Sequence, residues 1–249
     1  MQTSIPSTSS VLKTLLRSDF TTQWRNRRSV IMVVLIPVVI LITWKPLIKN
    51  FGGPFVIANC ITLGLNAIGL MGYSTSIARD REKGVFQRIR VAPLPGWTIM
   101  VSRLLVQLAM ILIVTAACFV VGYSYDHIVI APIGYIMGFL SALIGGALYL
   151  GLGQAIVGLI KSAETVNATV RFIYFIFIMV GMFGELGALG KEIGNIVQWS
   201  PYGTVKRIVA DSLVPSSWSN HTTYSLLATI GYAIVFAILG IKKFKWDVK

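Results

Sequence analysis

The sequence contains little charge. Only 12% of its 249 residues are charged, whereas 55% are hydrophobic, and the mean hydropathy is +0.75. A soluble domain carries about 25% charged residues, so this composition excludes an ordinary soluble protein and predicts an all-α integral membrane protein. The net charge of +13 comes from basic residues that lie between apolar runs. It therefore indicates membrane topology and not binding to nucleic acid.

Cysteine and histidine are equally scarce. Cys60 and Cys118 both lie inside apolar runs, and no CxxC spacing occurs, which argues against a disulfide framework or a thiolate metal site. His127 and His221 fall at the ends of apolar runs, where interfacial histidines are more common than metal ligands. We expect no metal in this chain.

A nucleotide-binding P-loop is also missing. That motif needs a glycine five residues before its Gly-Lys pair and a hydroxyl residue after it, because backbone amides and the hydroxyl hold the phosphates and magnesium. At Gly190-Lys191 these two places hold Glu185 and Glu192. The sequence therefore predicts no catalytic residues and no cofactor here, so any ATP and Mg²⁺ would bind a partner subunit.

Six apolar runs approach the roughly 20 residues that a membrane-spanning helix needs. They cover residues 29–48, 54–78, 98–122, 131–160, 167–184 and 222–241. Because no long soluble segment remains between them, we expect one membrane domain over residues 1–249.

The segment before the first run predicts an amphipathic helix over residues 9–28. Large apolar side chains recur every four residues and a basic cluster follows, at Leu12, Leu16, Phe20 and Trp24 and then at Arg25, Arg27 and Arg28. Such a helix lies in the membrane interface, with its basic end on anionic lipid. The alternative is a disordered basic tail.

A short charged segment separates the second and third runs. In IARDREKGVFQRIRVAPLPGW, residues 77–97, seven of 21 residues are charged. Helix formers predict one helix from Ala78 to Arg90, ended by the prolines that follow. Its apolar patch at Val85, Phe86 and Ile89, ringed by charges, suits docking into a groove of a soluble partner. Alternatively, it is a solvated loop whose basic residues only fix the topology.

Residues 185–221, between the fifth and sixth runs, are too polar for a span and too apolar for a loop. Trp199-Ser200-Pro201-Tyr202 should break them into two short helices, because a residue before proline disfavours the α region. We expect a helical hairpin that re-enters the membrane from outside.

The charged segment resembles the permease subunits of type-2 ATP-binding-cassette (ABC) exporters. The family pattern is Glu-Arg-Glu-x-Gly, a few residues, and then a small residue before Pro-Leu. Here Asp80-Arg81-Glu82-Lys83-Gly84 and Ala92-Pro93-Leu94 occupy those places, with Asp80 replacing the commoner glutamate. The resemblance implies that residues 78–90 are the cytoplasmic coupling helix that rests on the ATPase subunit, and Ser200-Pro201 matches the family's break in the hairpin.

The resemblance also implies the partners and the activity. The chain would pair with an ABC ATPase subunit and a second permease copy, surrounded by membrane lipid. The complex would use ATP to export a small hydrophobic or amphipathic molecule such as a drug, lipid-like compound or natural product. Polysaccharide, peptide or sodium export stays open, as do a non-ATP secondary carrier, a membrane-embedded enzyme, and an immunity or sensory role.

The site residues follow from these expectations. Contact with the ATPase subunit is expected from Arg79, Asp80, Arg81, Glu82, Lys83, Gly84, Phe86 and Arg90. The pathway through the membrane is expected to involve Asn66, Gln154, Arg171, Trp199 and Tyr202. Alternatively, Asn66 and Gln154 serve only as hydrogen-bonding links between helices, and Arg171 extends to the inner headgroups.

The basic residues predict the orientation. With the N-terminus in the cytoplasm of a cell whose plasma membrane holds the six spans, 17 of the 22 lysines and arginines face the cytoplasm and five face outward. Both termini are then cytoplasmic.

Single-cysteine labelling tests this orientation, in a background without Cys60 and Cys118. An impermeant thiol reagent applied to intact cells should label a cysteine at Lys191 and not one at Lys83, since the loop at Lys83 is expected inside. The reverse pattern would overturn the orientation.

Overall fold

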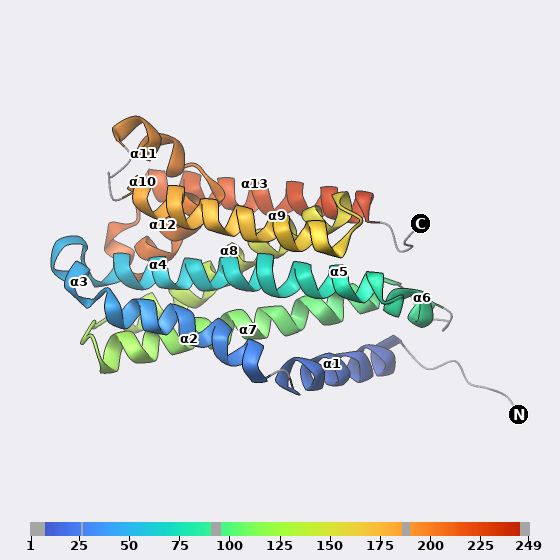
Figure 1. The fold of residues 1–249 in the computed structure, drawn as a ribbon. Helices are drawn as coiled ribbons and strands as arrows, with labels where there is room; N and C mark the ends of the chain where they lie inside the picture. The colour runs from blue at the N-terminus through green and yellow to red at the C-terminus, as the bar shows by residue number, and fades with distance from the viewer. Residues whose placement is uncertain (1–7, 26, 91–95, 186–189, 245–249) are drawn as a thin grey trace, which may run out of the picture.

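The computed structural model describes residues 8–25, 27–90, 96–185 and 190–244, and within these ranges the chain is helical without a strand (Figure 1). Five helices are long and apolar enough to cross a membrane: Gly53–Glu82, Thr98–Ser124, Pro132–Leu159, Ala163–Gly181 and Asn220–Lys243. The protein is therefore a multi-pass membrane protein. Its elements are α1 (Thr8–Arg25), α2 (Arg27–Thr43), α3 (Lys45–Phe51), α4 (Gly53–Asn66), η1 (Ala67–Ser74), α5 (Thr75–Glu82), α6 (Val85–Arg90), α7 (Gly96–Ser124), α8 (Pro132–Leu159), α9 (Ala163–Ile176), η2 (Phe177–Met182), α10 (Phe183–Glu185), α11 (Lys191–Val197), α12 (Pro201–Leu213), η3 (Pro215–Ser217) and α13 (Asn220–Lys243).

The first expected span, residues 29–48, is not a single helix. The helix α2 ends at Thr43, and α3 begins at Lys45 with a proline in its first turn. The 17 residues of α2 rise about 26 Å, which is less than a hydrocarbon core of about 30 Å. A sixth crossing is reached only if α1 and α2, bent by 61° at their junction, count together.

The helix α8 packs against most of the bundle, and glycines allow its neighbours to approach closely. It contacts α13, η1, α12, α7 and α4. A Cβ atom on Gly145 would lie 2.5 Å from Val205, and one on Gly146 would collide with Ile111. Further along α8, Gly153 faces the backbone of Gly69 in the π-helical segment η1. These contacts let backbones meet where larger side chains would separate them.

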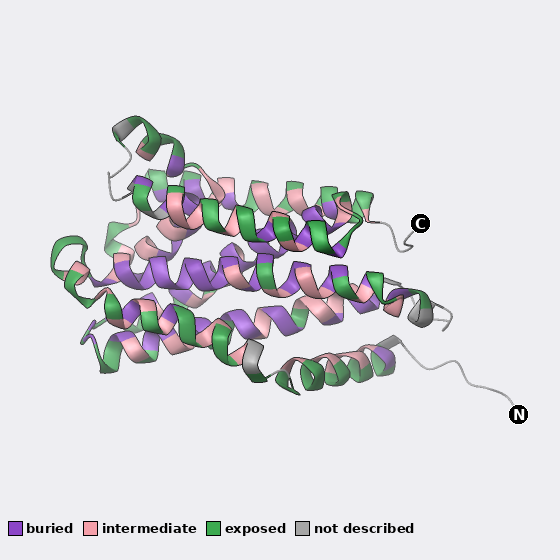
Figure 2. Cartoon of the chain, viewed as in Figure 1, coloured by how far each residue is buried: buried purple, intermediate pink, exposed green. Residues whose placement is uncertain are grey.

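Burial separates an inner helix from outer ones. The long helix formed by α4, η1 and α5 is largely buried, whereas α9 and α13 leave most of their surface exposed (Figure 2). Exposed apolar side chains such as Phe172, Phe175 and Leu227 lie on those two outer helices, as expected for surfaces that face lipid.

The elements cluster at two ends of the molecule. The start of α1, the end of α5, α6 and the end of α13 lie at one end, while α3 and α10 to α12 lie at the other (Figure 1). In the segment expected to form the hairpin, α11 ends at Val197 and α12 begins at Pro201, with the Ser200 hydroxyl accepting from the Gly203 amide. The depth of this segment in the bilayer stays a prediction.

Candidate functional site

The segment that the resemblance predicts to be the coupling helix, residues 78–90, is called the coupling segment below, and it is broken in its middle. The helix α5 runs out of the bundle and ends at Glu82, and α6 begins again at Val85. Gly84 between them has a φ of 66°, a left-handed conformation that glycine adopts without steric cost. The expectation of one helix from Ala78 to Arg90 is therefore wrong, because it weighed helix propensity and not the glycine stop signal.

Arg81 joins the end of α5 to the end of α8. Its guanidinium donates hydrogen bonds to the carbonyl oxygens of Val157 at 2.7 Å, Ile160 at 2.6 Å and Lys161 at 2.7 Å, and the residue is only 3% exposed. Carbonyls in the last turn of a helix have no partner within the helix, and the negative end of the helix dipole attracts a cation there. Arg81 therefore caps α8 and fixes α5 to the turn between α8 and α9.

Asp80, the residue before Arg81 in the motif, is bonded to a different helix, α7. Its Oδ2 lies 2.8 Å from Nη2 of Arg103 on α7. The Nε of Arg103 lies 3.2 Å from Oδ1 of Asp19 on α1, and Ser102 donates to the second oxygen of Asp19 at 2.6 Å. Burial raises the pKa of the Asp19 carboxyl, while the Ser102 hydrogen bond and the Arg103 charge act against that rise. The network thus ties α1, α5 and α7 together.

The outward side of the coupling segment is formed by Arg79, Glu82 and Lys83, which are all exposed. Phe86, expected as an exposed apolar knob, is 1% exposed and packs edge-to-face on Phe244, with ring centroids 6.0 Å apart. Of the eight expected ATPase contacts, three thus have partners within this chain: Asp80, Arg81 and Phe86. The side chain of Arg90 lies outside the described residues.

Three of the expected pathway residues lie inside the bundle. The Tyr202 hydroxyl on α12 donates to Asn59 Oδ1 on α4 at 2.8 Å, and Tyr73 donates to Gln154 Oε1 at 2.6 Å. Asn66 is fully buried, and neither amide atom has a hydrogen-bond partner in the described part of the chain. Buried polar groups are nearly always paired, so Asn66 is an exception among the buried residues, and its role in the pathway stays a prediction.

Arg171 and Trp199, the other two expected pathway residues, are exposed on α9 and after α11. Neither joins the buried polar groups. The position of Arg171 on the outside of α9 agrees with the alternative that it extends to the lipid headgroups.

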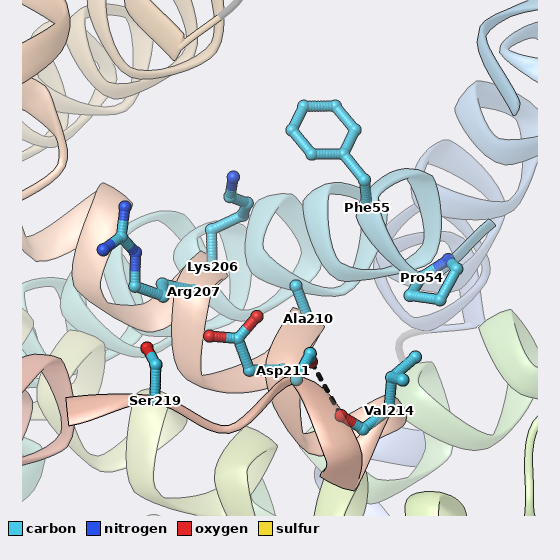
Figure 3. Close-up of a pocket in the computed structure, with 9 residues that line it drawn as sticks. Pro54, Phe55, Lys206, Arg207, Ala210, Asp211, Val214 and Ser219 are labelled. Atoms are coloured by element: carbon cyan, nitrogen blue, oxygen red, sulfur yellow. Dashed lines mark hydrogen bonds between the residues drawn. The ribbon is translucent and has the colours of Figure 1, made fainter. Parts of the chain in front are cut away.

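A pocket of about 480 Å³ lies beside α12, at the end of the molecule that the sequence predicts to face outward. Its wall combines Lys206, Arg207 and Asp211 from α12 with Phe55 from α4 (Figure 3). The Lys206 ammonium lies 4.4 Å from the centre of the Phe55 ring, a cation–π contact. Arg207 donates to Gln198 at 3.1 Å, and Asp211 accepts a hydrogen bond from Thr222. The pocket thus offers both charge signs beside an aromatic surface.

Sequence reasoning missed Asp19, Arg103 and Phe244 as members of the site. Arg103 carried a signal, since it is a charged residue within an apolar run. Asp19 was the one acidic residue of the amphipathic α1. For Phe244 no pattern in the sequence pointed to Phe86.

The family model of the ABC-2 family transporter proteins matches residues 46–242, from the first turn of α3 to the last turn of α13. The chain belongs to the ABC-2 transporter family. It is an ABC transporter permease, and membership implies a partnership with an ABC ATPase subunit. A comparison with curated proteins finds no match to this sequence.

Removing the Arg81 guanidinium should destabilise the permease. Arg81→Ala leaves three carbonyls without a donor and should cost about 2 kcal/mol or more, whereas Arg79→Ala on the exposed side of the same helix should change stability by about 0.5 kcal/mol or less. Thermal unfolding of the detergent-purified chain measures the loss of stability in both variants. Arg81→Lys keeps the charge but loses the forked set of donors, so its loss of stability should lie between those of the two alanine variants. Equal melting of the two alanine variants would contradict the capping role.

Proposed function

We propose that this permease exports a small hydrophobic or amphipathic molecule across the plasma membrane, driven by ATP hydrolysis in a separate ATPase subunit that binds ATP and Mg²⁺. Two permease copies and two ATPase subunits form the complex, and both termini of each permease are cytoplasmic. Transport proceeds by alternating access or gated extrusion. The missing P-loop supports the division of labour, because this chain has no motif with which to hold nucleotide phosphates.

The coupling segment carries the proposal. Its motif has an exposed side, at Arg79, Glu82 and Lys83, and a side that is bonded to two membrane helices: Asp80 pairs with Arg103 on α7, and Arg81 bonds to the end of α8. A surface that only fixed topology would need no such bonds. An element that transmits force needs both a free face for the partner and stiff attachments to the helices that move.

The pocket beside α12 supports an amphipathic substrate. An aromatic ring, two cations and a carboxylate line one space, so a molecule with an apolar body and a polar or charged group finds a complement for each part. The buried pair of Tyr202 and Asn59 links this helix to α4. We infer that the hairpin shapes the outer exit.

ATP hydrolysis should require the partner, and transport should require Glu82. The complex with the co-expressed ATPase, in proteoliposomes, should release phosphate and accumulate an amphipathic dye, while the permease alone should do neither. Glu82→Ala should leave assembly intact, because an exposed ion pair is worth only about 0–1 kcal/mol. It should nevertheless lower dye transport per ATP hydrolysed, because in this proposal Glu82 contacts an element of the ATPase subunit that moves during hydrolysis.

Glu164→Ala is the matched control, since Glu164 is exposed in the first turn of α9 at the same end of the molecule as Glu82 (Figure 1). It should assemble, hydrolyse and transport like the parent. Dye transport by the permease without any ATPase would instead favour a secondary carrier. Glu82→Ala and Glu164→Ala behaving alike would reduce the coupling segment to a topology signal.

A further inference from the structure

A groove of about 620 Å³ runs between α7 and α13, with α8 as its floor. Its walls include Leu104 and Leu108 of α7 and Ala233 and Ile241 of α13, and Ala147 lies on the floor. Ala147 is exposed although its neighbours on α8 are buried, so the floor is open to whatever lies beside the bundle. The lining is apolar except for the bonded pair of Tyr73 and Gln154.

The length of the groove and its place along the bundle match one leaflet of a membrane. Along α7 it extends from Met100 to Leu108 and along α13 from Ala233 to Ile241, which is about 12 Å on either helix. The hydrocarbon of one leaflet is about 15 Å thick. Both stretches lie toward the end of the bundle that carries α6. A single acyl chain that runs along the helices in this leaflet would fill the groove.

A polar group lies where the ester groups of a phospholipid would be. The 28 residues of α8 rise about 42 Å and so extend about 6 Å beyond the hydrocarbon core at each end. Gln154 lies five residues before that end, or about 7.5 Å, at the boundary of the core. It is 92% buried, and its amide Nε2 makes no hydrogen bond to any described residue. That amide is a free donor at the depth of an ester carbonyl.

Two lysines follow the groove-lining part of α13 at its C-terminal end. Ile241 is followed directly by Lys242 and Lys243, which are both exposed in the last turn of α13. Lysines at the membrane surface attract anionic headgroups. Toward the membrane surface the order is thus an apolar wall, then the amide donor of Gln154, then the two ammonium groups of Lys242 and Lys243. The acyl chain, ester and phosphate of a phospholipid follow one another in the same order.

We propose that this groove is a binding site for one anionic phospholipid of the leaflet at the α6 end. Its acyl chain lies between α7 and α13, an ester carbonyl accepts a hydrogen bond from Gln154, and its phosphate pairs with Lys242 and Lys243. The site does not depend on what the permease transports. It does reach the coupling segment, because Phe244 lines the groove and also packs on Phe86 of α6.

Photolabelling with a phosphatidylglycerol that carries a diazirine on its acyl chain tests the proposal on the full-length purified chain in phosphatidylcholine nanodiscs. Labelling of residues 100–108 and 233–241 should saturate at one lipid per chain. Ala147→Trp should abolish it by filling the floor, and Ala237→Phe provides a second block from the α13 wall. The matched control is Ala168→Trp, at an exposed alanine of α9 outside the groove, and it should label like the parent.

The headgroup is tested by replacing Lys242 and Lys243 with serine. This change should weaken phosphatidylglycerol binding about fivefold per lysine and leave binding of a phosphatidylcholine probe unchanged.

Labelling that never saturates and that covers α9 equally would show only annular lipid and would overturn the site. Labelling that survives both blocking variants in chains that melt like the parent would also overturn it. A groove that stays unlabelled while Ala147→Trp breaks a dimer would assign it to a second copy, and equal losses for both lipids would refute the anionic headgroup.

Discussion

The three hydrogen bonds from Arg81 to the end of α8 determine where the coupling segment sits. They join residues 76 to 80 positions apart in the sequence, and they satisfy carbonyls that α8 cannot satisfy itself. Because the guanidinium is planar and almost fully buried, it also fixes the angle at which α5 leaves the bundle. The position of α6, and the exposed surface of the motif, follow from that angle.

A second attachment gives the segment a rigid base. Arg103 holds Asp80 on one side and Asp19 on the other, so α7 and the amphipathic α1 join the same unit. Motion imposed on the exposed residues would therefore reach α7, α8 and α1 together. Phe86 and Phe244 extend the unit to the end of α13, where the groove proposed to bind a phospholipid begins. Through these contacts a lipid and an ATPase subunit would act on one body.

The sequence predicted the class of the fold and the family because the first depends on the distribution of apolar runs along the chain and the second on one local motif. Apolar runs marked the helices, and Asp80–Gly84 marked the coupling segment. It did not predict that Arg81 and Phe86 turn inward, since their partners lie far along the chain and no periodicity relates them. The break at Gly84 was readable from its glycine but was outweighed by the helix formers around it. The short α2 was missed because the apolar run continues past Thr43 into α3.

The central claim is that the coupling segment and the turn between α8 and α9 move as one body, and a distance between them tests it most directly. Spin labels at Lys83 and Ser162, two exposed positions on either side of the Arg81 contact, would be placed in a chain without Cys60 and Cys118. Double electron–electron resonance on the complex with its ATPase should give one narrow distribution of distances between the two labels. That distribution should be the same without nucleotide and with ATP. A distance that shifts between the two states while Arg81 is intact would contradict the account.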